Sequence, residues 1–179
     1  MGKGGFVELV KQGAKLVAAE LGITWDKDPS GEATSKAPPA RAMEGFAAGF
    51  TVGFEVRDSE LDGQGIVNNA NYLHYYEHAR HLYLRSRGID FVGMHEAGLD
   101  AVVFRIEVDY TESLRSGDEF SVGVSVAREG SLRLVFTQEI VKRSNGHIAS
   151  KAKVVTAIVS GGRPVRPPED LISRLLGFS

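Results

Sequence analysis

Alternating apolar and polar residues predict strands in the second part of the chain. The first such segment is 50–57, where every second side chain is apolar: Phe50, Val52, Phe54 and Val56. The same period recurs in the segments 102–110, 120–126, 132–140 and 147–160. Tight-turn sequences separate them, and Asn145-Gly146 is the strongest hairpin signal among these. Because successive side chains of a strand point to opposite faces, this pattern predicts antiparallel strands with one buried face.

A helical period replaces this alternation after residue 67. Asn68 and Asn69 are favoured N-cap residues, and Gly88 is a natural terminator. One stripe of the helix is polar, formed by Asn71, His74, His78, His81 and Arg85. The remaining circumference is mostly apolar, formed by Tyr72, Leu73, Tyr75, Tyr76, Ala79, Leu82, Tyr83 and Leu84. So wide an apolar arc predicts burial on most sides. One strand, one long helix and four further strands indicate an α+β fold with the helix packed on a curved sheet.

The two ends of the chain have a different character. Residues 1–43 combine an amphipathic helical pattern, 6–21, with a linker rich in Pro, Ser and Gly, which favours a docking or capping helix. A transit peptide is the alternative, but the five acidic residues of this segment argue against it. Residues 44–170 are expected to form the domain, and 171–179 a C-terminal tail that contains a short helix. The segment 161–170 contains too much proline for a central strand.

Composition narrows the class of protein. A chain of 179 residues is long enough for one domain with a sizeable core. Its net charge of −2 gives no electrostatic reason to expect nucleic-acid or anionic-membrane binding. The absence of cysteine excludes disulfides, zinc–thiolate sites and thiol nucleophiles, and no apolar run is long enough for a membrane span. We therefore expect a cytoplasmic protein, with a plastid left open for a processed eukaryotic chain.

The loop before the helix carries the candidate chemistry. Asp62 lies between Leu61 and Gly63, shortly before the predicted helix N-terminus. Free N–H groups and the helix dipole at such an end stabilise a developing oxyanion. A carboxylate beside an oxyanion site is what acyl transfer requires. The alternative is that Asp62 only bonds the following backbone of its turn, and the residues alone favour neither interpretation.

The segment DGQGIVNNANYLHYYEHAR resembles the signature of hot-dog fold acyl thioesterases of the 4-hydroxybenzoyl-CoA thioesterase type. The matching positions are Asp62, Gly65, Ile66-Val67, Asn68-Asn69, Tyr72-Leu73 and Glu77-His78-Ala79-Arg80. The segments VRDSELDGQGIVNNANY, LRSGDEF and RPVRPPE are most similar to plant-type acyl-lipid thioesterases, which include methylketone synthase enzymes. The resemblance covers residues 46–169. Some relatives carry His or Tyr in the cap where this chain has Asn68 and Asn69, so a mechanism through those side chains is not carried over.

The resemblance implies a hot-dog fold, an antiparallel sheet wrapped around one central helix, and hydrolysis of acyl thioesters of coenzyme A or acyl carrier protein. It implies Asp62 as nucleophile or general base, the Asn69 N–H as oxyanion donor, and an acyl chain beside the helix. The remaining substrate-binding positions are Gly65, Ile66, Val67, Asn68, Tyr72 and Leu73. A homodimer or homotetramer with active sites at the subunit interface is implied, and neither metal nor other cofactor is required.

Glu77 is the second catalytic candidate, because a helix Glu serves as nucleophile or base in one branch of these enzymes. Its alternative role is an ion pair with Arg80 or His81. The histidines of the polar stripe do not form the HExxH order, which favours a solvated or interface face over a metal site. Two other functions stay open: acyl-thioester binding without turnover, and an enoyl hydratase or dehydratase. Acyl length, 3-keto preference and the choice between coenzyme A and carrier protein are not determined by the sequence.

Overall fold

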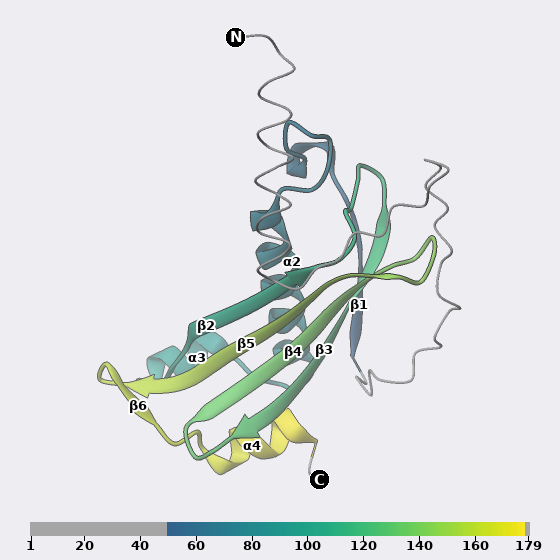
Figure 1. Ribbon diagram of the computed structural model, residues 1–179. Helices are drawn as coiled ribbons and strands as arrows, with labels where there is room; N and C mark the ends of the chain where they lie inside the picture. The colour runs from purple at the N-terminus through teal and green to yellow at the C-terminus, as the bar shows by residue number, and fades with distance from the viewer. Residues whose placement is uncertain (1–49, 178–179) are drawn as a thin grey trace, which may run out of the picture. The chain divides into compact units, whose positions relative to one another are not determined.

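An antiparallel sheet curves around one long helix in residues 50–177, the part of the chain that the computed structural model describes (Figure 1). The strands are β1 Thr51–Glu55, β2 Asp100–Tyr110, β3 Glu119–Glu129, β4 Arg133–Lys142, β5 Ile148–Ser160 and β6 Arg163–Val165. The helices are α2 Asn69–Ser86, α3 Phe91–Glu96 and α4 Glu169–Leu176, with a 3₁₀ turn η1 at Asp58–Glu60. The helix and linker predicted for residues 1–43 lie outside the described residues.

The sheet order is β1-β3-β4-β5-β2, and β6 pairs with the end of β5. All of these pairings are antiparallel. The strands before and after α2, which are β1 and β2, therefore occupy opposite edges, and the helix spans the concave side between them. The predicted α+β architecture with a central helix is confirmed. The proline-containing segment forms only the three residues of β6, as expected from its missing backbone donor.

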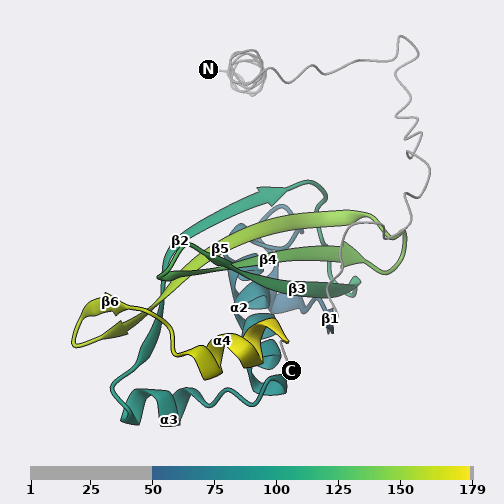
Figure 2. The same ribbon diagram turned by 90° about the horizontal axis from the view of Figure 1, so that it is seen from below.

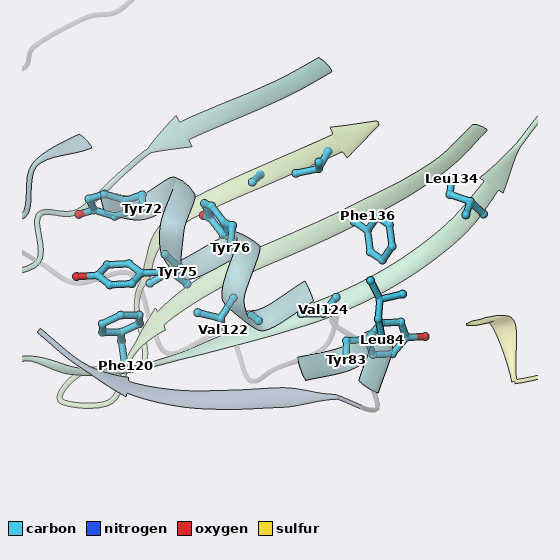
Figure 3. Close-up of a cluster of buried hydrophobic side chains, with 14 of the residues drawn as sticks. Tyr72, Tyr75, Tyr76, Tyr83, Leu84, Phe120, Val122, Val124, Leu134 and Phe136 are labelled. Atoms are coloured by element: carbon cyan, nitrogen blue, oxygen red, sulfur yellow. The ribbon is translucent and has the colours of Figure 1, made fainter. Parts of the chain in front are cut away.

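The core lies between α2 and the concave face of the sheet (Figure 3). Tyr72, Tyr76, Ala79 and Tyr83 recur at helical spacing and are all buried. The ring of Tyr75 packs against Phe120 of β3, with 4.8 Å between the centroids. Leu73, however, stays 38% exposed, because no element of the described residues covers that side of the helix. The prediction of burial on most sides thus holds for the sheet-facing side alone.

Two short helices complete the concave side (Figure 2). α3 lies within the segment 89–99, where the sequence predicted only a connector; its N-cap is Asp90, whose side chain accepts from Val92 N–H at 3.0 Å. Six residues are too few to give a readable helical period. α4 matches the predicted short C-terminal helix, and Leu171, Ile172 and Leu175 from it are buried in the core.

Candidate active site

The loop that carries Asp62 is a small, self-bonded turn. Leu61 and Val67 form an isolated antiparallel bridge, and the Asp62 N–H donates to the Ile66 carbonyl at 2.8 Å. Gly65 has a φ of 73°, which suits glycine, and its N–H returns to the Asp62 carbonyl at 3.0 Å. The Asp62 Oδ1 atom accepts from the Gln64 N–H at 2.8 Å. The turn role considered for Asp62 is therefore present, and it fixes the direction of the carboxylate that lines the cavity described below.

The N-terminus of α2 follows this loop directly. Asn68 is the N-cap, and its side-chain oxygen accepts from the Ala70 N–H at 3.0 Å, as predicted. Asn69 is the first helical residue, whose N–H has no partner inside a helix. The Tyr110 hydroxyl donates to the Asn69 carbonyl at 3.1 Å, which ties the helix start to the end of β2. A main-chain donor thus stands at the positive end of the helix dipole.

The segment 111–118 forms the opposite wall. Its central residue, Leu114, accepts from the Val67 N–H at 2.9 Å and donates to the Tyr72 hydroxyl at 3.3 Å. These two bonds attach the wall to both sides of the helix cap. Burial raises the pKa of Tyr72 and of Tyr110, so both hydroxyls stay protonated at neutral pH.

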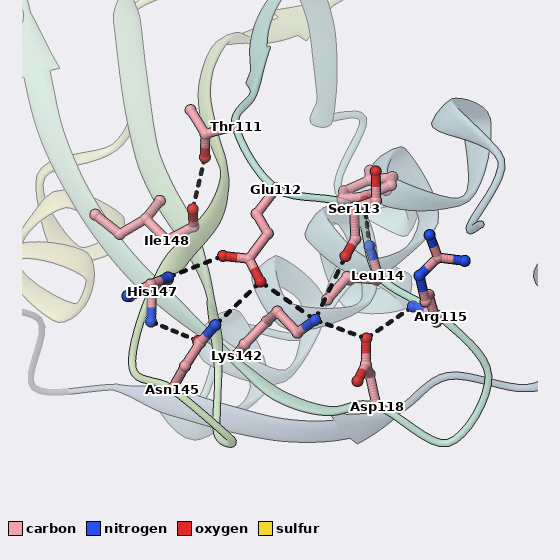
Figure 4. Close-up of polar contacts among 11 residues, drawn as sticks. Thr111, Glu112, Ser113, Leu114, Arg115, Asp118, Lys142, Asn145, His147 and Ile148 are labelled. Carbon is pink, nitrogen blue, oxygen red and sulfur yellow. Dashed lines mark hydrogen bonds and ion pairs between the residues drawn. The ribbon is translucent and has the colours of Figure 1, made fainter. Parts of the chain in front are cut away.

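A cluster of charged side chains holds this wall in place (Figure 4). The Lys142 ammonium lies 3.0 Å from Asp118 Oδ2 and 3.3 Å from Glu112 Oε1, so it joins both ends of the segment. Glu112 also accepts from Asn145 Nδ2 at 3.1 Å and lies 3.1 Å from His147 Nδ1. Sequence inspection did not single out these residues for the site, because the pairs link positions far apart in the chain.

The loop, the helix start and the wall enclose a cavity of about 400 Å³, which we call the catalytic cavity. It is lined by Asp62, Ile66, Val67, Asn69, Tyr72, Tyr110, Thr111, Glu112 and Ser113. Five of the predicted site residues thus come together in one place. Gly65 and Asn68 lie next to these in the same loop and cap. The cavity combines a carboxylate with an oxyanion-type donor, the pair that acyl transfer requires.

Glu60 is a further positioning residue that sequence reasoning missed. Its carboxylate accepts from the Tyr75 hydroxyl at 2.6 Å and from the Arg57 N–H at 2.8 Å. Its carbonyl accepts from Asn71 Nδ2 at 2.7 Å. The pKa of Tyr75 is raised mainly by burial and further by its hydrogen bond to Glu60. These contacts fasten η1 to α2. Asp58, a second carboxylate four residues before Asp62, accepts from the Ser116 hydroxyl and therefore has a structural partner.

Two predicted residues of α2 lie outside the catalytic cavity. Leu73 and Glu77 are exposed on the helix and are not among the cavity-lining residues. The predicted ion pair of Glu77 with Arg80 or His81 is not formed in the described structure. Arg80 is buried instead and donates to Gln138 Oε1 at 2.9 Å. Gln138 lies on β4, 58 residues further along the chain, so the i,i+4 spacing within a helix could not predict this contact.

Histidines form one stripe of α2, and basic residues lie along the strands. Among residues 50–177, no group of His, Cys, Asp and Glu is arranged to hold a metal ion. Each of five basic strand residues pairs with a carboxylate: Arg128 with Glu169, Arg133 and Lys153 with Glu129, Arg143 with Glu119, and Lys151 with Glu139. Their positive charge is therefore partly neutralised, which favours ordinary solvent-facing roles. No helix in the described part of the chain is long and apolar enough to cross a membrane.

The comparisons with known proteins show the family of the chain. Residues 56–175 match the thioesterase-like superfamily. The chain is 32% identical to an acyl-acyl carrier protein thioesterase, ATL3, of Arabidopsis thaliana chloroplasts, over 75% of this chain and 72% of that protein. It is 30% identical to the acyl-CoA thioesterase YbgC of Haemophilus influenzae, over 69% of this chain and 91% of that protein. The chain therefore belongs to the thioesterase-like superfamily, which confirms the predicted class of enzyme, a thioester hydrolase.

Solved structures support the hot-dog fold. A hypothetical protein from Aquifex aeolicus superimposes with a TM-score of 0.66 at 28% identity, over 70% of this chain and 98% of that one. A 1,4-dihydroxy-2-naphthoyl-CoA thioesterase from Synechocystis gives 0.67 at 16% identity, over 70% and 94%. At the latter identity the likeness shows the fold alone. The predicted hot-dog architecture is confirmed, whereas the cytoplasmic location stays a prediction.

Proposed function

We propose that this protein hydrolyses fatty acyl thioesters of coenzyme A or acyl carrier protein. The observation that carries the proposal is the catalytic cavity, in which Asp62 and the N-terminus of α2 at Asn69 line one space. The thioester carbonyl oxygen accepts a hydrogen bond from the Asn69 N–H, so that negative charge developing on this oxygen is stabilised. The named activities of the Arabidopsis and Haemophilus relatives support both candidate carriers.

Asp62 acts as nucleophile or as general base in this proposal. As nucleophile it forms an acyl anhydride that water then hydrolyses; as base it removes a proton from the attacking water. In both routes the C–S bond breaks and one water molecule is consumed. One proton of this water ends on the sulfur, which leaves as a thiol, and the remaining hydroxyl group becomes part of the carboxylic acid product. The Gln64 N–H on Oδ1 keeps the carboxylate oriented during the reaction.

The test is thiol release from a panel of acyl-CoA and acyl carrier protein thioesters by wild type and Asp62→Asn. We expect kcat to fall by about a thousandfold or more, with an unchanged melting temperature, since the half-buried side-chain amide keeps the oxygen that the Gln64 N–H binds. Asp58→Asn is the control carboxylate in the same region. Equal release by wild type and Asp62→Asn would refute the catalytic role of Asp62, and Glu77→Gln would then test the second candidate. Binding of acyl thioesters without release by wild type would indicate an acyl-binding protein.

We also propose that a second copy of the chain covers the β2 edge. β2 is eleven residues long and is the last strand of the sheet order, so one side of its backbone is unpaired within the described residues. Its apolar side chains are unusually exposed: Val103 44%, Phe104 53% and Ile106 41%. A long apolar edge of this kind requires a covering partner. Light scattering should give a dimer or tetramer for wild type and a smaller species for Ile106→Lys; a monomeric wild type at micromolar concentration contradicts the proposal.

A further inference from the structure

A second pocket lies at the other end of α2 from Asp62, and we call it the distal pocket. Its volume is about 70 Å³. It is lined by His81, Leu84, Ile89, Phe91, Met94, Ala101, Val103, Leu134, Phe136, Thr156, Ile158, Leu171 and Leu175. These side chains come from α2, α3, α4, β2, β4, β5 and the connector between α2 and α3, and Figure 2 shows α3 and α4 on the concave side of the sheet. The short helices α3 and α4 therefore form the side of the pocket opposite the sheet.

The chemistry of the distal pocket fits a hydrocarbon. Eleven of its thirteen lining residues are apolar, and the two polar residues are Thr156 and His81. The Thr156 hydroxyl donates to the Leu134 carbonyl at 3.1 Å, so it has no unmet hydrogen bond. The His81 ring packs against Phe91 with 5.3 Å between centroids, and burial lowers its pKa, which favours the neutral ring. So apolar a lining favours an apolar ligand over water.

An exposed apolar strip connects the two pockets. Tyr110 of β2 lines the catalytic cavity, and Val103 of the same strand lines the distal pocket. Ile106 lies between them on the same face, because it pairs with the buried Val154 of β5. It is 41% exposed, and Leu73 on the neighbouring surface of α2 is 38% exposed. The β2 side chains Val108 and Ile106 therefore offer apolar surface between the two pockets, whereas the exposed Glu77 interrupts the apolar surface on the α2 side.

We propose that the distal pocket receives the methyl end of a long-chain acyl group whose thioester carbon lies at Asp62. This inference rests on the proposed function. Twelve residues of α2, from Asn69 to His81, span about 18 Å. Seven residues of β2, from Tyr110 to Val103, span about 23 Å. Because an extended chain advances about 1.2 Å per bond, these spans correspond to acyl groups of about 16 to 20 carbon atoms.

The volume of the distal pocket determines how strongly the enzyme should prefer long acyl chains over short ones. At about 70 Å³ it has roughly half the volume of a 150 Å³ cavity that binds benzene, so it holds about three carbon atoms. Each buried methylene changes affinity about fourfold, so filling the pocket with three carbon atoms should raise kcat/KM about sixtyfold. Chains too short to reach the distal pocket gain none of this factor.

The experiment compares kcat/KM for thioesters with eight, twelve, sixteen and eighteen carbon atoms, on coenzyme A and on acyl carrier protein. We expect wild type to prefer the two longer chains. Ala101→Phe fills the distal pocket from β2, and strands favour phenylalanine. It should lower the ratio of kcat/KM for sixteen carbon atoms to that for eight about sixtyfold. Val102→Phe is the matched control, because Val102 neighbours Ala101 in β2 and does not line the pocket. Its ratio should equal that of wild type.

The outcomes separate the two proposals. Thiol release by wild type with an unchanged ratio in Ala101→Phe overturns the distal pocket and leaves the thioesterase function standing. A wild-type preference for eight carbon atoms overturns it as well. If Ala101→Phe releases no thiol from any chain, Met94→Trp decides, since it fills the same pocket from α3. Absence of release from every substrate by wild type overturns the proposed function itself.

Discussion

The charge cluster behind the catalytic cavity leads to a prediction about Lys142. Its ammonium joins Glu112 and Asp118, which lie at the two ends of the segment that forms the cavity wall. Leu114, in the middle of that segment, bonds the backbone of Val67 and the hydroxyl of Tyr72. Lys142→Met retains a long unbranched side chain and removes the charge. We therefore expect it to lower both the stability of the fold and the catalytic rate.

The size of the stability loss follows from burial. Exposed ion pairs contribute about 0–1 kcal/mol, whereas removing one partner of a fully buried pair costs about 3–5 kcal/mol. The Lys142 side chain is 12% exposed, and its partners are 31% and 23% exposed, which places the cluster between these limits. Both carboxylates keep other donors, Asn145 for Glu112 and the Arg115 N–H for Asp118. We expect a loss of about 2 kcal/mol at pH 7, or about 6 °C in melting temperature.

The loss should depend on pH in a defined way. Burial raises the pKa of Glu112 and Asp118, but hydrogen bonds from Lys142 and its neighbours outweigh it, so both pKa values are lowered. A lowered carboxyl pKa stabilises the fold above the unfolded value of about 4, and this stabilisation disappears as the pH falls through the folded pKa. Burial lowers the pKa of Lys142, but its two carboxylates raise it overall, so its contribution is lost above about pH 10.4. The difference between wild type and variant should be constant from about pH 5 to 9 and shrink outside that window.

Denaturant unfolding across this pH range measures the effect, and thiol release at pH 7 measures kcat. Lys151→Met is the matched control: Lys151 pairs with Glu139 at 2.9 Å, but its side chain is 51% exposed. It should cost less than about 1 kcal/mol and leave kcat unchanged. The reasoning is refuted if Lys142→Met loses no more stability than Lys151→Met, or if its loss is the same at pH 3 as at pH 7.

Two further predictions concern buried polar groups. The Tyr76 hydroxyl is buried and forms no hydrogen bond of normal geometry within residues 50–177, because its polar neighbour Ser150 donates to the Asp109 carbonyl at 2.7 Å. Tyr76→Phe should therefore raise the free energy of unfolding by about 1 kcal/mol; a measured loss contradicts this. Gln138→Leu removes the acceptor of the buried Arg80 guanidinium, whose burial lowers its pKa, and should cost about 3 kcal/mol. The double variant with Arg80→Met should recover most of that loss in the same unfolding assay, and additive losses would refute the coupling.

Local signals in the sequence were sufficient for the elements and for part of the site. The period of two predicted the strands β1 to β5, since successive side chains of a strand point to opposite faces, and Asn68 and Gly88 marked the ends of α2. The turn around Asp62 and the helix cap are adjacent in the chain, so their meeting at one cavity follows from local structure. The resemblance then supplied the family, which no period or cap alone could give.

Only the tertiary structure decided which elements cover each apolar face. The helical pattern marks Leu73 as apolar like Tyr76, yet Leu73 is 38% exposed and Tyr76 is buried. The partner of Arg80 is Gln138, which lies 58 residues away, and not the nearby Glu77. Periodicity determines which side chains share a face of an element. It contains no information on which distant element packs there, because strand order and register depend on contacts across the whole chain.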